Sequence, residues 1–113
     1  MPRIEDYRFG RIVIDGTEQT RDVIILPDRV VANWWRQEGH ALVLADLTDV
    51  LDDLPGHLIV GTGASGQMRP DPETMEALRR RGVEVKVAPT GDAVRLFNEA
   101  DAATTAAAMH LTC

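Results

Sequence analysis

Residues 58–73 read LIVGTGASGQMRPDPE, and this stretch decides the fold class. Its continuous apolar run, Leu58–Val60, predicts a strand buried on both faces. Asp71 suits a helix N-cap and Pro72 the first helical position, so a helix is predicted over residues 72–81, with Gly82 at its C-terminal end. A buried strand that leads into a helix is typical of an α/β domain.

The chain after Gly82 continues this alternation. Residues 83–87 (VEVKV) alternate apolar and polar side chains, which predicts a half-exposed strand near a sheet edge. Thr90 suits the cap of a second helix, which carries Ala93 and Phe97 on one face. Residues 104–111 are predicted to return as a last strand. Successive βαβ units of this kind predict a mixed sheet with right-handed crossovers.

The chain before residue 58 favours antiparallel β-structure. Two β-rich runs, residues 7–14 and 20–26, flank Asp15-Gly16, a dipeptide typical of a tight hairpin turn. Residues 30–36 predict a third strand, and helical spacing predicts a short helix over residues 47–54. We therefore expect a single α/β domain over residues 1–113, with a central mixed β-sheet flanked by helices and an N-terminal antiparallel β-hairpin layer.

The composition argues against several classes of function. The 113 residues carry a formal net charge of −6. Nucleic acid and anionic membranes both select a basic face, so neither is expected as a partner. No apolar run reaches the ~20 residues of a membrane span, and we expect a cytoplasmic protein. Cys113 is the only cysteine, which rules out an intrachain disulfide and a multi-cysteine metal site, and no metal is expected.

Three glycines, Gly61, Gly63 and Gly66, match the G-x-G-x-x-G spacing of dinucleotide-binding loops. In such loops the helix begins within the glycine turn, whereas here residues 67–71 delay it. The acidic residue that would bind the ribose is also missing, because the end of the next strand reads Ala88-Pro89-Thr90. We therefore expect neither a dinucleotide nor another cofactor.

Two interpretations of this loop stay open. The glycines either allow a sharp turn with close backbone packing, or their N–H groups form a nest for a small anion at the end of a strand. The hydroxyls of Thr62 and Ser65 and the charge of Arg69 would assist the anion. The candidate ligand-binding residues are Gly61, Thr62, Gly63, Ala64, Ser65, Gly66, Arg69 and Thr90.

The adjacent tryptophans Trp34 and Trp35 precede Arg36. In a strand, one indole would face inward and the other outward. The simpler interpretation is one core residue and one partly covered residue. The alternative is an interface for a partner protein or a second subunit, because Trp and Arg are enriched where interfaces contribute most binding energy. These three residues are the candidate interface.

His110 with Ser65 or Cys113 would make a nucleophile–base pair. Ser65 does not stand in a G-x-S-x-G motif, and no orienting acid is identifiable in the sequence. His110 and Cys113 are three positions apart, so in a strand they would face opposite sides. We expect a packed or surface histidine and an unreactive thiol.

Several pieces of the chain together resemble the small Mth-type α/β domain, a family of unknown function. They are Tyr7-Arg8-Phe9-Gly10, DVIILPD (22–28), Trp35-Arg36, Gly39-His40, LIVGTGASG (58–66), Ala88-Pro89-Thr90, Ala93, Phe97-Asn98 and AAAMHLTC (106–113). The resemblance covers nearly the whole chain and implies a mixed sheet flanked by helices, but no established reaction. Its family-like positions are Gly61, Thr62, Gly63, Pro89, Thr90, Asn98, His110 and Cys113.

Relatives in that family include vertebrate adipogenesis-associated proteins and a mitochondrial assembly factor for respiratory complex I. The assembly factor holds partner proteins, although its mitochondrial role is not expected here. We therefore expect a non-catalytic binding or assembly module that acts through a protein partner or self-association. The alternative is an enzyme or sensor that binds a small anion at Gly61–Gly66.

Overall fold

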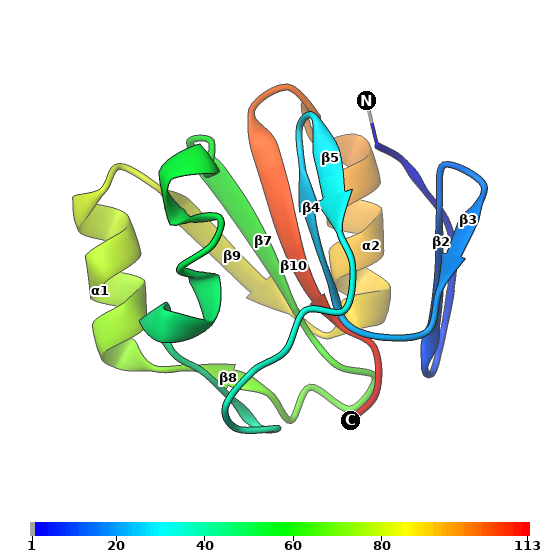
Figure 1. Ribbon diagram of the computed structural model, residues 1–113, viewed down its shortest axis with the longest axis horizontal. Helices are drawn as coiled ribbons and strands as arrows, with labels where there is room; N and C mark the ends of the chain where they lie inside the picture. Colours follow the sequence, from blue (N-terminus) through cyan, green and yellow to red (C-terminus); the bar gives the residue numbers. More distant parts are fainter. Residues whose placement is uncertain (1) are drawn as a thin grey trace.

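The computed structural model describes residues 2–113. A five-stranded sheet with the order β5-β4-β10-β7-β9 forms its centre, and a separate antiparallel sheet, β1-β2-β3, lies beside it (Figure 1). The strands are β1 (Ile4–Arg8), β2 (Arg11–Ile14), β3 (Thr17–Gln19), β4 (Val23–Leu26), β5 (Arg29–Val31), β6 (Ala41–Leu42), β7 (His57–Thr62), β8 (Arg69–Pro70), β9 (Glu84–Ala88) and β10 (Thr105–His110). The helices are the 3-10 helices η1 (Leu44–Leu47) and η2 (Leu51–Asp53) and the α-helices α1 (Pro72–Arg80) and α2 (Thr90–Glu99).

The main sheet is mixed, as the sequence predicts. Strands β7, β9 and β10 run parallel, whereas β4 pairs antiparallel with β10 and β5 antiparallel with β4. Strand β10 is central, and all six of its residues are buried. Strand β9 lies at the edge and is partly exposed, which confirms the prediction from its alternating pattern.

Each face of the main sheet carries its own hydrophobic core. Alternate residues of one strand point to opposite faces, so Ala106 and Ala108 of β10 join the core that contains Leu78 of α1. Ala107 and Met109 join the other core, together with Phe97 of α2 and residues of the small β1-β2-β3 sheet. Figure 1 shows these two sides of the main sheet, with α1 on one and α2 and the small sheet on the other. The alternation of side chains along β10 supplies apolar residues to both sides.

The tight turn at Asp15-Gly16 is confirmed. Both residues have positive φ, 50° and 81°, and they join β2 to β3 in an antiparallel hairpin. The two β-rich runs around this turn divide differently from the prediction. The first breaks into β1 and β2 at Phe9-Gly10, and the second ends in β4, which joins the main sheet instead of the hairpin layer.

Two more local predictions are wrong. The third strand stops at Val31, so residues 34–36 lie in a loop. The predicted helix over residues 47–54 is instead the pair η1 and η2. The strand is short because Asn33 adopts a left-handed φ of 55° and Trp34 turns into the core.

The helix from Pro72 is confirmed, with Gly82 in a left-handed conformation after its end. Thr90 does not cap the second helix. It is the first residue of α2 and is completely buried, and Pro89 occupies the capping position. Within residues 2–113, no helix combines the length and the apolar character that a membrane crossing requires.

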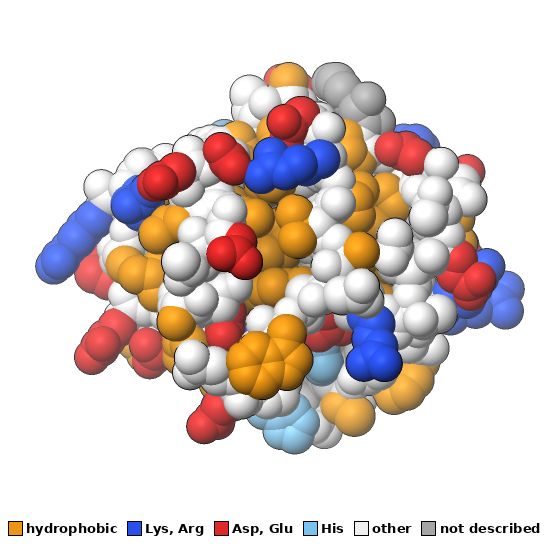
Figure 2. All heavy atoms as spheres, in the orientation of Figure 1, with side chains coloured by type: hydrophobic (Ala, Val, Ile, Leu, Met, Phe, Trp, Pro, Cys, Tyr) orange, Lys and Arg blue, Asp and Glu red, His pale blue; other side chains and the backbone are white. Residues whose placement is uncertain are grey.

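The face seen in Figure 2 carries apolar side chains gathered across its middle, over the main sheet, with charged side chains mostly towards the margins.

Candidate functional site

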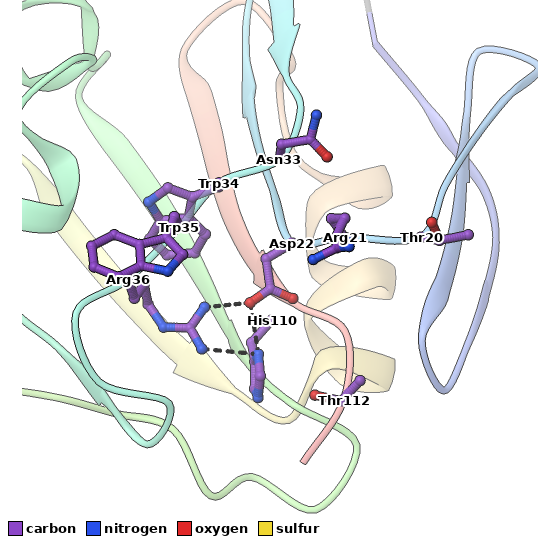
Figure 3. Close-up of a pocket in the computed structure, with 9 residues that line it drawn as sticks. All are labelled: Thr20, Arg21, Asp22, Asn33, Trp34, Trp35, Arg36, His110 and Thr112. Carbon is purple, nitrogen blue, oxygen red and sulfur yellow. Dashed lines mark hydrogen bonds and ion pairs between the residues drawn. The ribbon is translucent and has the colours of Figure 1, made fainter.

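A hollow of about 610 Å³ opens at the end of β10, where β4 begins and the loop after β5 crosses (Figure 3). It combines side chains from separate parts of the chain. The lining residues are Thr20, Arg21, Asp22, Asn33, Trp34, Trp35, Arg36, His110 and Thr112. We call this hollow the Asp22 pocket.

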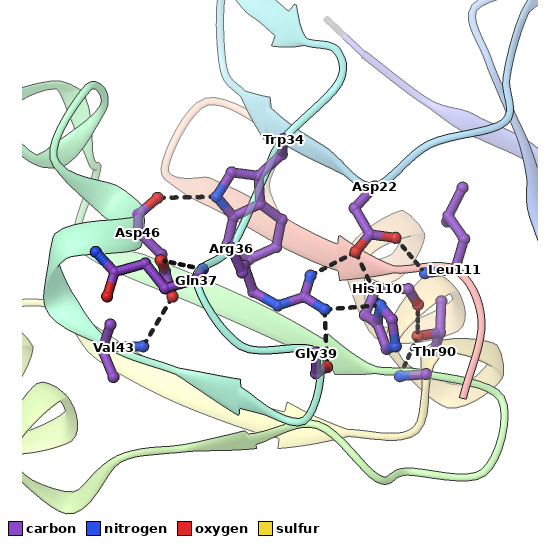
Figure 4. A network of polar contacts seen from close by, with 11 residues as sticks. Asp22, Trp34, Arg36, Gln37, Gly39, Val43, Asp46, Thr90, His110 and Leu111 are labelled. Carbon is purple, nitrogen blue, oxygen red and sulfur yellow. Dashed lines mark hydrogen bonds and ion pairs between the residues drawn. The ribbon is translucent and has the colours of Figure 1, made fainter.

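A cluster of three polar side chains forms the floor of the Asp22 pocket. Arg36 Nη1 and His110 Nδ1 both donate to Oδ2 of Asp22, the second over 2.8 Å. Oδ1 of Asp22 accepts the Leu111 amide at 2.8 Å. The exposed fractions of these side chains are small, 5% for Arg36, 15% for Asp22 and 9% for His110. The cluster is therefore a largely buried ion pair with an imidazole attached (Figure 4).

The hydrogen bonds of Asp22 determine its ionisation. Burial acts to raise the pKa of the carboxyl, but hydrogen bonds from His110, the Leu111 amide and Arg36 outweigh burial and lower the pKa. Asp22 is therefore a carboxylate near neutral pH. Nδ1 of His110 lies 2.8 Å from this carboxylate, which can only accept, and 3.1 Å from Arg36 Nη2, which can only donate. We assign the hydrogen to Nδ1 because the contact with the ionised carboxylate is the shorter one, so the Arg36 Nη2–Nδ1 contact is a close approach and not a hydrogen bond.

This assignment leaves Nε2 as the reactive nitrogen of His110. No residue within 2–113 forms a hydrogen bond with Nε2, and Nε2 is not among the fully buried atoms without a partner. Nε2 is therefore accessible to solvent. A carboxylate-oriented imidazole of this kind accepts or donates a proton at Nε2.

The two tryptophans have different environments. Trp34 is 8% exposed, and its Nε1 donates to the Asp46 backbone oxygen at 2.8 Å. The Arg36 guanidinium lies over the Trp34 ring, 5.1 Å from its centroid. Trp35 is 76% exposed and also lines a second hollow of about 360 Å³. One indole faces in and the other out, although the residues lie in a loop instead of a strand.

The loop that carries Trp35 is held at both ends. Trp34 and Arg36 are buried, and Arg36 Nη2 donates to the Gly39 backbone oxygen at 3.0 Å. The Asp46 carboxylate accepts the amides of Gln37 and Val43 at 3.2 and 3.1 Å (Figure 4). The backbone at Trp35 is therefore fixed before any partner arrives.

The glycine loop uses most of its amides internally. Gly63 N–H donates to the Thr90 hydroxyl at 2.8 Å, and Ala64 N–H to the Thr112 backbone oxygen at 2.6 Å. Gly66 N–H donates to the Gly63 oxygen at 3.2 Å. Three of the four amides from Gly63 to Gly66 thus have partners within the chain, which supports the packing interpretation.

Close packing explains two of the glycines. A Cβ atom on Gly61 would lie 2.6 Å from Met109 Sδ and 2.9 Å from Thr90 Oγ1. Gly63 has a φ of 102°, and a Cβ atom there would lie 2.3 Å from the backbone carbon of Cys113. The glycines let β7 approach both α2 and the segment after β10.

The remaining predicted site residues are dispersed. Ser65 and Arg69 are exposed. Arg69 belongs to β8, and its backbone amide donates to the His40 backbone oxygen. The Thr62 hydroxyl donates to the Ala88 oxygen at 3.1 Å. Among residues 2–113, neither Ser65 nor Cys113 forms a hydrogen bond with the His110 ring. The anion site at this loop stays a prediction.

Sequence reasoning missed Asp22, which is the acid that orients His110. Its partners Arg36 and His110 lie 14 and 88 positions away in the chain, and no local motif marks them. The only local sign is a charged residue directly before the apolar run of β4.

Residues 4–111 match the family model described as "Protein of unknown function (DUF498/DUF598)". The match spans nearly the whole chain, so the chain belongs to this family. Its resemblance to the Mth-type domains is confirmed, and the family itself is one of unknown function.

Solved structures share the fold over nearly the whole of this chain. Conserved hypothetical protein PH1505 from Pyrococcus horikoshii OT3 is 30% identical with a TM-score of 0.82, over 98% of this chain and 99% of that one. The Rpa2829 protein from Rhodopseudomonas palustris is 28% identical with a TM-score of 0.69, over 95% and 81%. A Mth938-like domain protein from Bordetella pertussis is 20% identical with a TM-score of 0.78, over 97% and 85%, and supports the fold alone.

Proposed function

We propose that this chain is a non-catalytic binding module that engages a protein partner, or a second copy of itself, through Trp35. The observation that carries this proposal is the position of Trp35, which is 76% exposed and lies between hollows of about 610 and 360 Å³. An exposed aromatic side chain beside hollows of this kind is typical of the residues that dominate protein–protein binding energy.

Preorganisation supports the same interpretation. Trp34 and Arg36 anchor the loop on both sides of Trp35, so little backbone freedom is lost on binding. The smaller hollow is lined in part by Val31, Ala32 and Ala45, which are not buried and offer apolar contact area next to the indole. A partner would cover the indole and this hollow together.

The polar cluster below Trp35 does not by itself favour catalysis. The Asp22–His110 pair orients an imidazole, but no hydroxyl or thiol of residues 2–113 forms a hydrogen bond with that ring. A nucleophile–base pair requires such a contact. We therefore place the cluster in a binding role, and a cytoplasmic location belongs to the same proposal.

The test compares two exposed aromatic residues. Trp35→Ala removes the proposed anchor, whereas Phe9→Ala removes a side chain that is 63% exposed in the β1–β2 turn. Each protein is immobilised in equal amounts, exposed to lysate of the source organism, and also measured by light scattering for self-association. We expect the native protein and Phe9→Ala to retain the same stoichiometric partner or oligomer, and Trp35→Ala to lose it. A strictly monomeric native protein without a partner would overturn the proposal.

A further inference from the structure

We propose that the Asp22 pocket binds a small organic oxyanion, a carboxylate or phosphate attached to an apolar body. The volume of about 610 Å³ lies within the ~300–1,000 Å³ of small-molecule sites, and exceeds what a bare inorganic anion would fill. This inference does not rest on the proposed protein partner.

The charge of the pocket favours an anion. Its lining holds two arginines, Arg21 and Arg36, against one carboxylate, Asp22. Each of the four other hollows that we compare has more acidic than basic lining residues, leaving histidines aside. On a chain of net charge −6, a pocket with a basic excess is a local feature that attracts an anionic ligand against the overall charge.

The charged side chains of the pocket differ in how far they are paired within the chain. Asp22 is held by three donors, from Arg36, His110 and the Leu111 amide, so its charge is largely neutralised inside the chain. Arg21 forms no ion pair or side-chain hydrogen bond within residues 2–113, and its guanidinium remains available. Figure 3 places Arg21 and Trp35 on opposite sides of Asp22. An anionic head group on the Arg21 side of the pocket would meet this guanidinium directly.

Trp35 defines the body of the ligand. Its exposed indole forms part of the rim, whereas the Trp34 ring is already covered by the Arg36 guanidinium. A flat apolar group packs well on an exposed indole face. The best match is an aromatic or similarly flat body whose oxyanion points to Arg21.

The experiment is a ¹H–¹⁵N correlation titration of the whole chain with sodium benzoate, inorganic phosphate and benzyl alcohol. Benzyl alcohol has the aromatic body of benzoate without the charge. We expect benzoate to shift the amide signals around Asp22 and His110 and the Trp35 indole signal, and benzyl alcohol to bind at least about fivefold more weakly. Phosphate shifts at the same amides support a general oxyanion site, and benzoate shifts without phosphate shifts support a site that also requires the apolar body.

Two matched variants locate the anion. Arg21→Gln removes the available charge of the pocket, and Arg69→Gln removes an exposed arginine that also forms no ion pair within residues 2–113. We expect Arg21→Gln to weaken benzoate binding by about three- to fivefold and Arg69→Gln to leave it unchanged.

Three results would overturn the proposal. The first is the absence of shifts around Asp22 and His110 at about 50 mM benzoate and phosphate, well above millimolar dissociation constants. The second is equal binding of benzoate and benzyl alcohol. The third is a loss of affinity in Arg69→Gln with none in Arg21→Gln, which would move the anion to the loop Gly61–Gly66.

Discussion

The Asp22 carboxylate and the His110 imidazole meet over 2.8 Å although 88 positions separate them in the chain. Strand register brings them together, because β4 and β10 pair antiparallel with Val23 opposite Met109. One step further along this ladder lie Asp22 and His110. The same step brings the Leu111 amide to Oδ1 of Asp22. The pairing of β4 with β10 thus positions both Asp22 and His110 on the floor of the Asp22 pocket.

Replacing the acid should destabilise the fold strongly. Asp22→Ala leaves the Arg36 guanidinium buried without its carboxylate, and breaking a buried ion pair in this way costs about 3 kcal/mol. Urea unfolding monitored by circular dichroism measures the loss. Asp28→Ala, which removes an exposed partner of Arg29, serves as control and should stay within about 0.5 kcal/mol. Equal losses in the two variants would contradict the role of Asp22.

The pH dependence of stability should report the same carboxyl. Its hydrogen bonds lower the pKa of Asp22 below the ordinary 3.8, even though burial opposes this shift. The unfolded chain then binds the proton more readily, so this contribution is present above about pH 4 and is lost as pH falls through the folded pKa. Urea midpoints from pH 7 downward should therefore converge for the native protein and Asp22→Asn. A constant difference at all pH values would refute the assignment.

Truncation of the two tryptophans should affect stability to very different extents. Trp34→Ala removes a core side chain and its hydrogen bond to Asp46, with an expected loss of about 3 kcal/mol. Trp35→Ala removes a side chain that is 76% exposed and should change stability by less than about 0.5 kcal/mol. Thermal and urea unfolding of both variants check this contrast. A comparable loss in both would mean that Trp35 is structural and unsuited to the binding test.

The glycine loop can be tested with one added methyl group. Gly63→Ala combines a positive φ of 102° with a clash against the Cys113 backbone and should cost at least about 2 kcal/mol. Gly91→Ala is the matched control, because no heavy atom lies within 4 Å of a Cβ there. It lies in the first turn of α2 and should be neutral or stabilising by up to about 1 kcal/mol. If both variants were equally stable, the packing interpretation would be contradicted, and the interpretation of this loop as an anion-binding nest would be favoured again.

Thr90 joins the glycine loop to the end of β10. Its hydroxyl accepts the Gly63 amide at 2.8 Å and donates to the His110 backbone oxygen at 2.6 Å. Thr90→Val keeps the shape but leaves that buried amide without an acceptor, at a cost of about 2 kcal/mol. Thr90→Ser retains the hydroxyl and should lose only about 1 kcal/mol from the missing methyl group. Amide hydrogen exchange at Gly63 should accelerate in Thr90→Val alone, and slow exchange there would contradict the link.

Much of the architecture could be predicted because its signals are local. The apolar run of β7, the helix from Pro72, the alternation in β9 and the turn at Asp15-Gly16 each depend on a few neighbouring residues. The errors fall where tertiary contacts override local pattern. The chain departs from the line of β5 so that Trp34 enters the core. The buried Thr90 hydroxyl does not cap α2 but bonds two backbone groups, Gly63 N–H and the His110 oxygen, that are distant in the chain.

The sequence by itself determined the class of fold and the glycines of two local turns, Gly16 and Gly82, since hydrophobic periodicity and backbone preference act over a turn or a strand. Only the tertiary structure decided which tryptophan is exposed, what occupies the amides of the glycine loop, and which acid orients His110. These features depend on strand register and on the approach of segments far apart in the chain. The periodicity of one segment says nothing about strand register or about which distant segment lies beside it. Hydrogen bonds between two segments form only after both segments are in place.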